Sequence, residues 1–108
     1  AMARAKFQTL TEQMFYVLLC LREERCGADV LALVRRMTDD RVSIGSGTLY
    51  DLLEQFTREG FIEETKLEGR RRSYRLTSRG EALLQGEYRR LQAQIADYER
   101  MSGRGETP

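Results

Sequence analysis

The chain contains no histidine and no tryptophan, and it has only two cysteines, Cys20 and Cys26. Histidine is the commonest general base and transition-metal ligand in proteins, and two thiols alone do not complete a zinc site. No nucleophile–base pair is recognisable, and Gly45-Ser46-Gly47 is too short for a phosphate-binding loop. The sequence therefore predicts a protein that is not an enzyme, with no catalytic residue, no metal site and no cofactor.

Proline and long apolar runs are also scarce. The single proline is Pro108, so no proline interrupts a long helix. No apolar run is long enough to cross a bilayer and no signal-peptide pattern opens the chain, so we expect a cytoplasmic protein without a membrane partner. In a reducing cytosol we expect Cys20 to be a buried thiol on a helix face, and Cys26, near a helix end, to be a candidate for an exposed one.

The composition is that of an ordinary globular protein. With 108 residues, 41% of them hydrophobic and 32% charged, the chain fits one helix-rich domain with a modest core. The formal net charge is +1, so the overall balance does not indicate a nucleic-acid partner. The distribution of charge has to be examined segment by segment.

Two helices are expected in the first 40 residues. Thr9 and Glu12 have the spacing of a capping box, and apolar residues at helical spacing then continue to about Arg25. Gly27 interrupts this pattern, which resumes and continues to about Asp40. The apolar residues that trace these two helical faces are Leu10, Met14, Val17, Leu18 and Leu21, followed by Val30, Leu33, Val34 and Met37.

The segment from residue 46 to residue 60 predicts a third helix suited to reading DNA. Ser46 is expected to be the N-cap, and Gly60 is expected to end the helix as its C′ glycine. A small, polar first turn beside an apolar stripe is the shape that enters a major groove. The irregular connection before it completes a helix-turn-helix unit, in which Val42 and Ile44 predict a minimal strand. The apolar stripe consists of Leu49, Leu52, Leu53 and Phe56.

A hairpin rich in arginine follows. Residues 61–67 and 72–76 read as two short strands around a turn that contains Gly69. From Gly69 to Arg79 there are five arginines and no acidic residue, which is the charge that a phosphate backbone attracts. The alternative is a solvated hairpin whose arginines only keep an edge strand soluble. Next to a helix-turn-helix pattern, the segment predicts a DNA-binding wing.

The last helix carries a heptad pattern. Thr77 is a plausible N-cap for a helix that runs from about Ser78 to Met101. A helix of this length cannot bury its apolar stripe on so small a core, which predicts a second copy of the chain as its partner. The alternative is that it packs back on the first helix. The expected interface residues are Phe15 on the first helix and Leu84, Tyr88, Leu91, Ile95 and Tyr98 on the last.

Together these segments predict an α+β fold that is mainly α, a winged helix-turn-helix with a C-terminal dimerisation helix. We divide the chain into a basic flexible arm over residues 1–8, a winged helix-turn-helix DNA-binding domain over residues 9–76, a dimerisation helix over residues 77–101 and a disordered tail over residues 102–108.

The chain from Thr11 to Gly80, together with the length of the last helix, resembles the PadR family of bacterial transcriptional regulators, in its short-tailed branch. The resemblance rests on Gly47-Thr48-Leu49-Tyr50, Gly60-Phe61-Ile62, the arginine-rich wing that ends in Tyr74, and Leu76-Thr77 with Gly80. It implies a homodimeric repressor that places two third helices in successive major grooves and is released by a small aromatic effector. The chain departs from the family at Cys26-Gly27-Ala28, where only the glycine is retained, and it lacks the tryptophan of some drug-binding members.

The predicted partners are therefore double-stranded DNA, a second copy of the chain and a small aromatic effector. The alternatives are a winged-helix protein-interaction module and a winged-helix regulator of another family. The candidate DNA-binding residues are Ser46, Thr48, Tyr50, Lys66, Arg70, Arg71 and Arg72, and the candidate ligand-binding residues, which would line a cavity between two copies, are Tyr16, Tyr88 and Tyr98.

Overall fold

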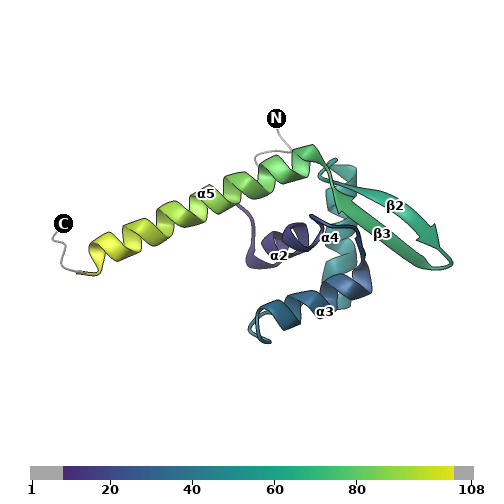
Figure 1. Ribbon diagram of the computed structural model, residues 1–108, viewed down its shortest axis with the longest axis horizontal. Coiled ribbons are helices and arrows are strands. Elements are labelled where there is room, and N and C mark those ends of the chain that lie inside the picture. Colours follow the sequence, from purple (N-terminus) through teal and green to yellow (C-terminus); the bar gives the residue numbers. More distant parts are fainter. Residues whose placement is uncertain (1–8, 104–108) are drawn as a thin grey trace.

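The computed structural model describes residues 9–103, and over this range the chain forms four helices and a three-stranded antiparallel sheet (Figure 1). This arrangement confirms the predicted fold class, a mainly helical winged helix. The expected arm over residues 1–8 and residues 104–108 of the expected tail lie outside the described residues. In chain order the elements are α2 (Glu12–Cys20), β1 (Arg25–Cys26), α3 (Gly27–Met37), α4 (Ser46–Arg58), β2 (Ile62–Glu68), β3 (Arg71–Leu76) and α5 (Ser78–Met101).

The first helix is shorter than the sequence pattern indicated. Its N-cap is Thr11, whose hydroxyl accepts a hydrogen bond from the Met14 N–H at 3.2 Å, so the predicted capping box at Thr9 was wrong. The prediction that the helix continues to about Arg25 was also wrong, because α2 ends at Cys20 and Arg25 belongs to a strand. The apolar periodicity continued past the helix end because Leu21 is buried in the same core.

Strand β1 is the element that the sequence analysis missed. Arg25 pairs with Tyr74 and Cys26 with Ser73, so β1 forms an edge of the sheet in the order β1-β3-β2. This pairing binds the hairpin to the segment between α2 and α3. A strand of two residues is too short to show a periodic sequence pattern, so it can be identified only from its pairing with β3 in the folded chain. By contrast, Val42 and Ile44 are buried but belong to no strand of the described chain, so that predicted strand was wrong.

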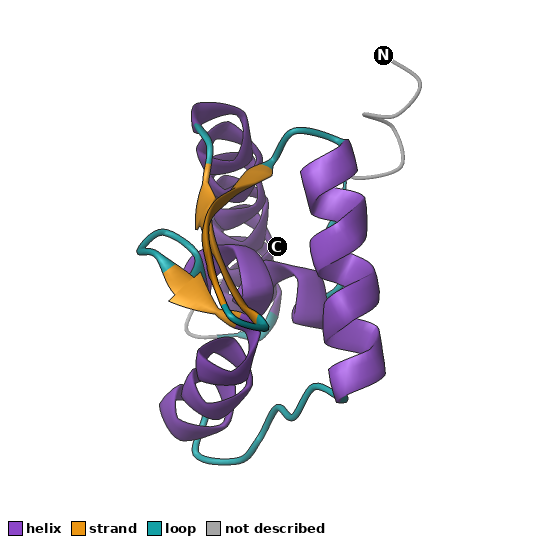
Figure 2. Ribbon diagram, turned by 90° about the vertical axis from the view of Figure 1, so that its right-hand side faces the viewer, coloured by secondary structure: helices purple, strands orange, loops and turns teal. Residues whose placement is uncertain are grey.

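The core lies where α2, α3 and α4 meet the base of the hairpin (Figure 2). The predicted apolar stripe of α4 is confirmed, because all four of its residues are buried. Apolar burial of this kind is the main favourable term in folding. Among the described residues, the largest fully buried side chains are Phe56, Leu18, Leu21, Leu49, Leu53, Ile62, Val17, Val30, Val34 and Cys20.

Three elements meet at one junction, where α4 ends, β2 begins and α5 starts. Gly60 has a φ of +80° and ends α4 as the predicted C′ glycine, with Phe61 N–H donating to the Phe56 carbonyl at 2.9 Å. The Thr77 hydroxyl donates to the Gly60 carbonyl at 2.7 Å, and the Thr77 N–H donates to the Phe61 carbonyl at 3.0 Å. The start of α5 is therefore attached directly to the end of α4.

Helix α5 has two different halves. Thr77 is its N-cap, as predicted, and accepts from the Gly80 N–H at 3.1 Å. The first half packs on the domain through the buried Leu84, whereas the second half projects well beyond it (Figure 1). Within residues 9–103, no helix has both the length and the apolar character needed to cross a membrane.

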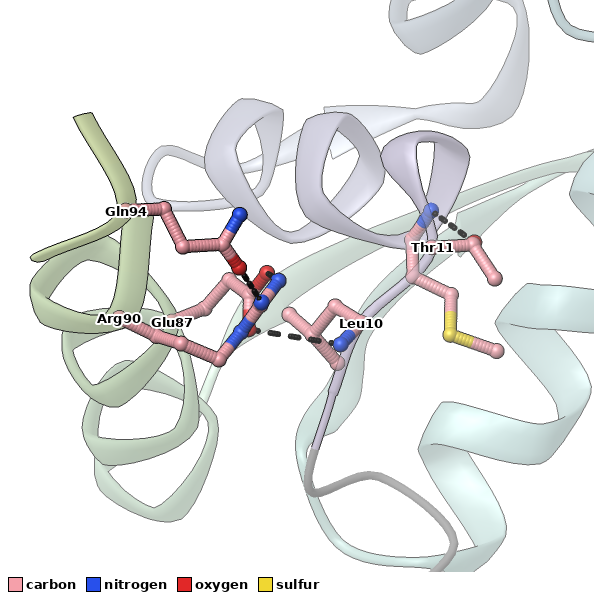
Figure 3. A network of polar contacts seen from close by, with 6 residues as sticks. Leu10, Thr11, Glu87, Arg90 and Gln94 are labelled. Carbon is pink, nitrogen blue, oxygen red and sulfur yellow. Dashed lines mark hydrogen bonds and ion pairs between the residues drawn. The ribbon is translucent and has the colours of Figure 1, made fainter. Parts of the chain in front are cut away.

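A buried carboxylate ties α5 to the segment before α2 (Figure 3). Glu87 is only 4% exposed, and its carboxylate accepts from the Arg90 Nε at 2.9 Å and from the Leu10 N–H at 3.4 Å. Arg90 in turn donates to Gln94. These contacts, with Arg90 contributing most, lower the pKa of Glu87.

Replacing Gly80 should test the junction directly. A Cβ at position 80 would lie 2.0 Å from the Phe61 carbonyl oxygen, so Gly80→Ala forces backbone movement and should lower the free energy of unfolding by about 3 kcal/mol. Gly86 is the matched control in the same helix, since a Cβ there meets nothing within 4 Å. Gly86→Ala should stabilise the protein by about 0.5–1 kcal/mol in urea unfolding. Equal effects of the two changes would disprove the tight contact.

The Glu87 network should make stability depend on pH. The pKa of Glu87 is lower in the folded state than its unfolded value of about 4.3. The ionised carboxylate therefore contributes its full stabilisation to the folded state above that pH. The contribution is lost as the pH falls through the lower folded pKa. Glu87→Gln should therefore cost about 1.5 kcal/mol at neutral pH in urea unfolding, and this difference should shrink as the pH falls towards about 2.

Asp97→Asn is the control for this series. Asp97 forms an exposed ion pair with Arg100 at 2.7 Å in the same helix. Exposed pairs contribute little, so the variant should change the free energy of unfolding by less than about 0.5 kcal/mol at any pH. A Glu87→Gln effect that does not vary with pH would show that the carboxylate charge is not what stabilises this contact.

Candidate nucleic-acid interface

The N-terminus of α4 is open to solvent. Gly45, not Ser46 as predicted, is the N-cap, because Gly45 keeps an extended backbone and its carbonyl accepts the Leu49 N–H at 2.9 Å. Among the described residues, no side chain caps this end. Ser46 and Thr48, both predicted DNA-binding residues, are exposed in the first turn. Uncapped N–H groups and the positive end of the helix dipole together favour an anion at this position.

Tyr50 lies against the start of α3. A Cβ at Gly27 would come within 3.0 Å of the Tyr50 ring, so the absence of a side chain at Gly27 makes room for the ring. Tyr50 is nevertheless 53% exposed. The sequence analysis named Tyr50 as a candidate DNA-binding residue, and in the structure its ring lies against α3 while part of it remains exposed. This contact gives a physical reason for the glycine that the chain retains from the family pattern.

All the predicted wing cations except Arg70 are already paired with carboxylates. All these pairs are exposed at the surface, where an ion pair is worth less than about 1 kcal/mol, so they orient the side chains without blocking them. Arg70, beside the turn residue Gly69, forms no ion pair within residues 9–103. The pairs are Lys66 with Glu24, Arg71 with Asp29, Arg72 with Glu64 and Arg75 with Glu63, with N–O distances from 3.2 to 3.5 Å.

Two of these pairs hold the hairpin against the helical part of the domain. Arg71 reaches Asp29 on α3, and it also contacts the Cys26 side chain; both contacts raise its pKa, with Cys26 contributing most. Lys66 reaches Glu24 in the loop before β1. The sequence analysis missed these carboxylates because Asp29 lies 42 residues before Arg71 in the chain.

A groove of about 960 Å³ separates α4 from the hairpin. Tyr50, Leu53 and Arg58 line it from α4, while Arg70 and Tyr74 line it from the hairpin side. Tyr74 is half-buried, and this burial raises the pKa of its phenol, although the nearby Arg72 opposes the shift. The structure thus brings Tyr50 and the arginines 70 to 72 to one groove, whereas Lys66 is not among the residues that line it.

The residues predicted for the dimer interface fall into two groups. Leu84 is buried within its own chain, and Phe15 and Leu91 are half-buried. The remaining three, Tyr88, Ile95 and Tyr98, are exposed along α5. Phe15 and Tyr88 line a hollow of about 320 Å³ between α2 and α5. Position 98 lies ten residues beyond Tyr88, about 15 Å further along the helix, so one chain does not gather the three predicted ligand tyrosines around one cavity.

The cysteines show no sign of a reactive or metal-binding site. Cys20 and Cys26 are both free and buried, so the expectation that Cys26 is exposed was wrong: its backbone pairs with Ser73. Burial raises the pKa of the Cys20 thiol to about 11, although the nearby Arg25 opposes the shift. The described part of the chain has no cluster of three His, Cys, Asp or Glu residues that could hold a metal ion.

Comparisons with known proteins agree with this geometry. The chain matches the model of the transcriptional regulator PadR-like family over residues 17–86, which span α2 to the middle of α5. A search of curated protein sequences gives no match.

Three of the solved structures that match the fold illustrate the similarity to this chain. A transcriptional regulator from Clostridium thermocellum has a TM-score of 0.71 at 21% identity, covering 82% of this chain and 91% of that chain. RosR from H. salinarum has a TM-score of 0.60 at 22% identity, covering 82% and 92%. The complex hsRosR-S4 has a TM-score of 0.65 at 23% identity, covering 89% and 80%. At such identities the likeness shows the fold alone.

Proposed function

The chain belongs to the PadR-like family of transcriptional regulators, and we propose that it acts as a homodimeric, sequence-specific repressor of transcription. The observation that carries this proposal is the exposed start of α4 followed by Tyr50, which shares a groove with the arginines of the hairpin. The two elements together offer hydrogen-bond donors to base edges and positive charge to phosphates. Such a protein works on the chromosome in the cytoplasm and needs no catalytic residue.

In this proposal, the first turns of α4 enter the major groove. Ser46 and Thr48 are exposed there and supply hydroxyls to phosphates or base edges. Tyr50 supplies a third hydroxyl, from a ring that α3 supports at Gly27. The free N–H groups of the first turn add a phosphate contact that carries no sequence information.

The hairpin supplies the electrostatic part of the affinity. Arg70 is exposed and forms no ion pair among the described residues, so it is available to a phosphate at no cost in existing contacts. Arg71, Arg72 and Lys66 would exchange exposed carboxylate partners for phosphates. Because such surface pairs are weak, the exchange costs little compared with the release of counterions from DNA.

We further propose that a second copy of the chain covers the projecting half of α5. Tyr88, Ile95 and Tyr98 share the heptad seam of α5 and are exposed in one chain. A dimer built there would relate two α4 helices by a two-fold axis, as a palindromic operator requires. A small aromatic ligand held between the two copies by Tyr16, Tyr88 and Tyr98 would weaken DNA binding if it changed the spacing of the two α4 helices.

A protein-interaction module is the second candidate function. The observation that favours it is the neutralisation of four hairpin cations by carboxylates, which leaves this face less positive than the arginine run alone indicates. The salt dependence of binding to duplex DNA distinguishes the two, since only a phosphate contact releases condensed counterions.

The first test is a titration with duplex DNA taken from upstream of the protein's own gene. If Arg70, Arg71 and Arg72 of both subunits contact phosphate, affinity should fall roughly a thousandfold between about 50 and 200 mM salt. The double variant Arg70→Ala/Arg72→Ala should reduce the slope of log affinity against log salt from about −5 to about −2. Fluorescence anisotropy of labelled duplex measures both quantities.

The matched control is Arg89→Ala/Arg100→Ala, which removes the same charge from exposed positions on α5. Its salt slope should equal that of the wild-type protein. Absence of DNA binding at low salt would exclude the repressor function and would turn attention to protein partners. Equal slopes for the two double variants would exclude the hairpin as the phosphate-binding element.

The second test concerns the dimer. Ile95→Asp places a charge in the exposed seam of α5 and should convert a dimer into a monomer, measured by sedimentation equilibrium. Ala93→Glu is the matched control, because position 93 is exposed and lies off the seam. A wild-type protein that sediments as a monomer, or two variants that behave alike, would rule out this interface.

A further inference from the structure

The exposed face of α4 carries a negative charge where the proposed function brings this helix against DNA. Successive residues of a helix lie about 100° apart, which defines the stripe directly opposite the buried residues. That stripe is exposed and consists of Gly47, Asp51, Glu54 and Arg58. We propose that Asp51 is a specificity-determining residue, which accepts a hydrogen bond from the amino group of one cytosine in the major groove. This inference rests on the proposed DNA-binding function and names a base that the site requires.

Asp51 has no role in the fold that the described residues reveal. Within residues 9–103 its carboxylate forms no ion pair and no hydrogen bond. It is the sixth residue of α4, and the first turn contains no acidic residue, so Asp51 lies beyond the reach of the positive end of the helix dipole. The positions three and four residues away hold glycine, threonine, glutamate and glutamine, so no cation of α4 lies beside it. The charge is therefore left for a partner outside the chain.

The surroundings of Asp51 leave room for a base edge. A Cβ at Gly47, one turn earlier on the same stripe, would meet nothing within 4 Å. Asp51 is not among the residues that line the groove between α4 and the hairpin, whereas Glu54 and Arg58 are. A base pair can therefore approach the Asp51 carboxylate from outside this groove while the hairpin contacts the DNA backbone.

An ionised carboxylate distinguishes the base edges of the major groove. It only accepts hydrogen bonds, and the phosphates, guanine O6 and N7, and thymine O4 are also acceptors, so none of them can bind it. Adenine offers its N6 amino group, but the acceptor N7 lies beside that group on the same base. Cytosine offers its N4 amino group with no acceptor beside it on its own edge, so cytosine is the base that Asp51 favours.

The same charge disfavours DNA that lacks this cytosine. A carboxylate brought against phosphates and acceptor edges is repelled, and only a correctly placed donor offsets that cost. The hairpin cations bind phosphates of any sequence, so they raise specific and non-specific affinity together. Asp51 therefore raises the ratio of specific to non-specific affinity, which decides how well a regulator finds its site.

Selection of bound duplexes from a pool with a randomised central segment tests this role with the full chain. The wild-type protein should enrich a site with cytosine fixed at one position, and replacing that C·G pair by T·A should weaken binding by about tenfold or more. Asp51→Ala should lose the preference at that position alone, leaving less than about a twofold difference between the two duplexes. Asp51→Asn should prefer adenine there, because an amide bonds to N6 and N7 of adenine together.

Binding to a duplex without the selected site measures the repulsion. On this duplex the affinity of Asp51→Ala should exceed that of the wild-type protein by about threefold or more. Glu99→Ala is the matched control, because it removes an exposed carboxylate of α5 that forms no ion pair within residues 9–103. This control changes the net charge by the same amount and should keep both the cytosine preference and the wild-type affinity.

The outcomes separate this inference from the proposed function. A wild-type protein that binds duplexes without a preferred cytosine, or an Asp51→Ala variant that keeps the preference, would overturn the role of Asp51 and leave DNA binding intact. Loss of preference at every position in Asp51→Ala, or the same change in Glu99→Ala, would also overturn it, by showing a general effect on the helix or on net charge. No binding of any duplex at low salt would exclude the DNA-binding function, and this inference with it.

Discussion

The contact between the first turn of α5 and the backbone of Phe61 is the constraint on which the other elements depend. Gly80 allows α5 to approach the Phe61 carbonyl so closely that no side chain fits between them. Thr77 bonds to the last residues of the α4 segment at the same point. The directions of the DNA-facing helix, the hairpin and the projecting helix are therefore set together, and a change of angle between any two of them must break hydrogen bonds at this junction.

The pairing of β1 with β3 completes this frame on the other side of the hairpin. It holds the hairpin beside the start of α3, where Asp29 and the Cys26 side chain meet Arg71. The groove exists because the hairpin is held at both edges, by α4 through the junction and by α3 through β1. A nearly neutral chain can thus present several arginines on one surface. Weak ion pairs with carboxylates orient these arginines, and a phosphate can replace the carboxylates at little cost.

Much of this architecture could be predicted from local patterns. The stripe of α4, the glycine that ends it, the turn at Gly69 and the cap at Thr77 each depend on residues within one or two helical turns. The errors were of a different kind. The first helix ended early and the cap of α4 moved by one residue, because backbone pairing and the path of the preceding loop decide such boundaries, and neither leaves a periodic signal.

The sequence by itself determined the fold class, the order of the main elements and the family, because apolar periodicity and turn residues act over short distances along the chain. Only the tertiary structure decided what the candidate residues contact. The carboxylate partners of the wing arginines, the clearance that Gly27 gives to Tyr50 and the groove that Arg58 shares with Arg70 all join segments far apart in sequence. Contacts of this range depend on how whole elements pack, so no local pattern encodes them.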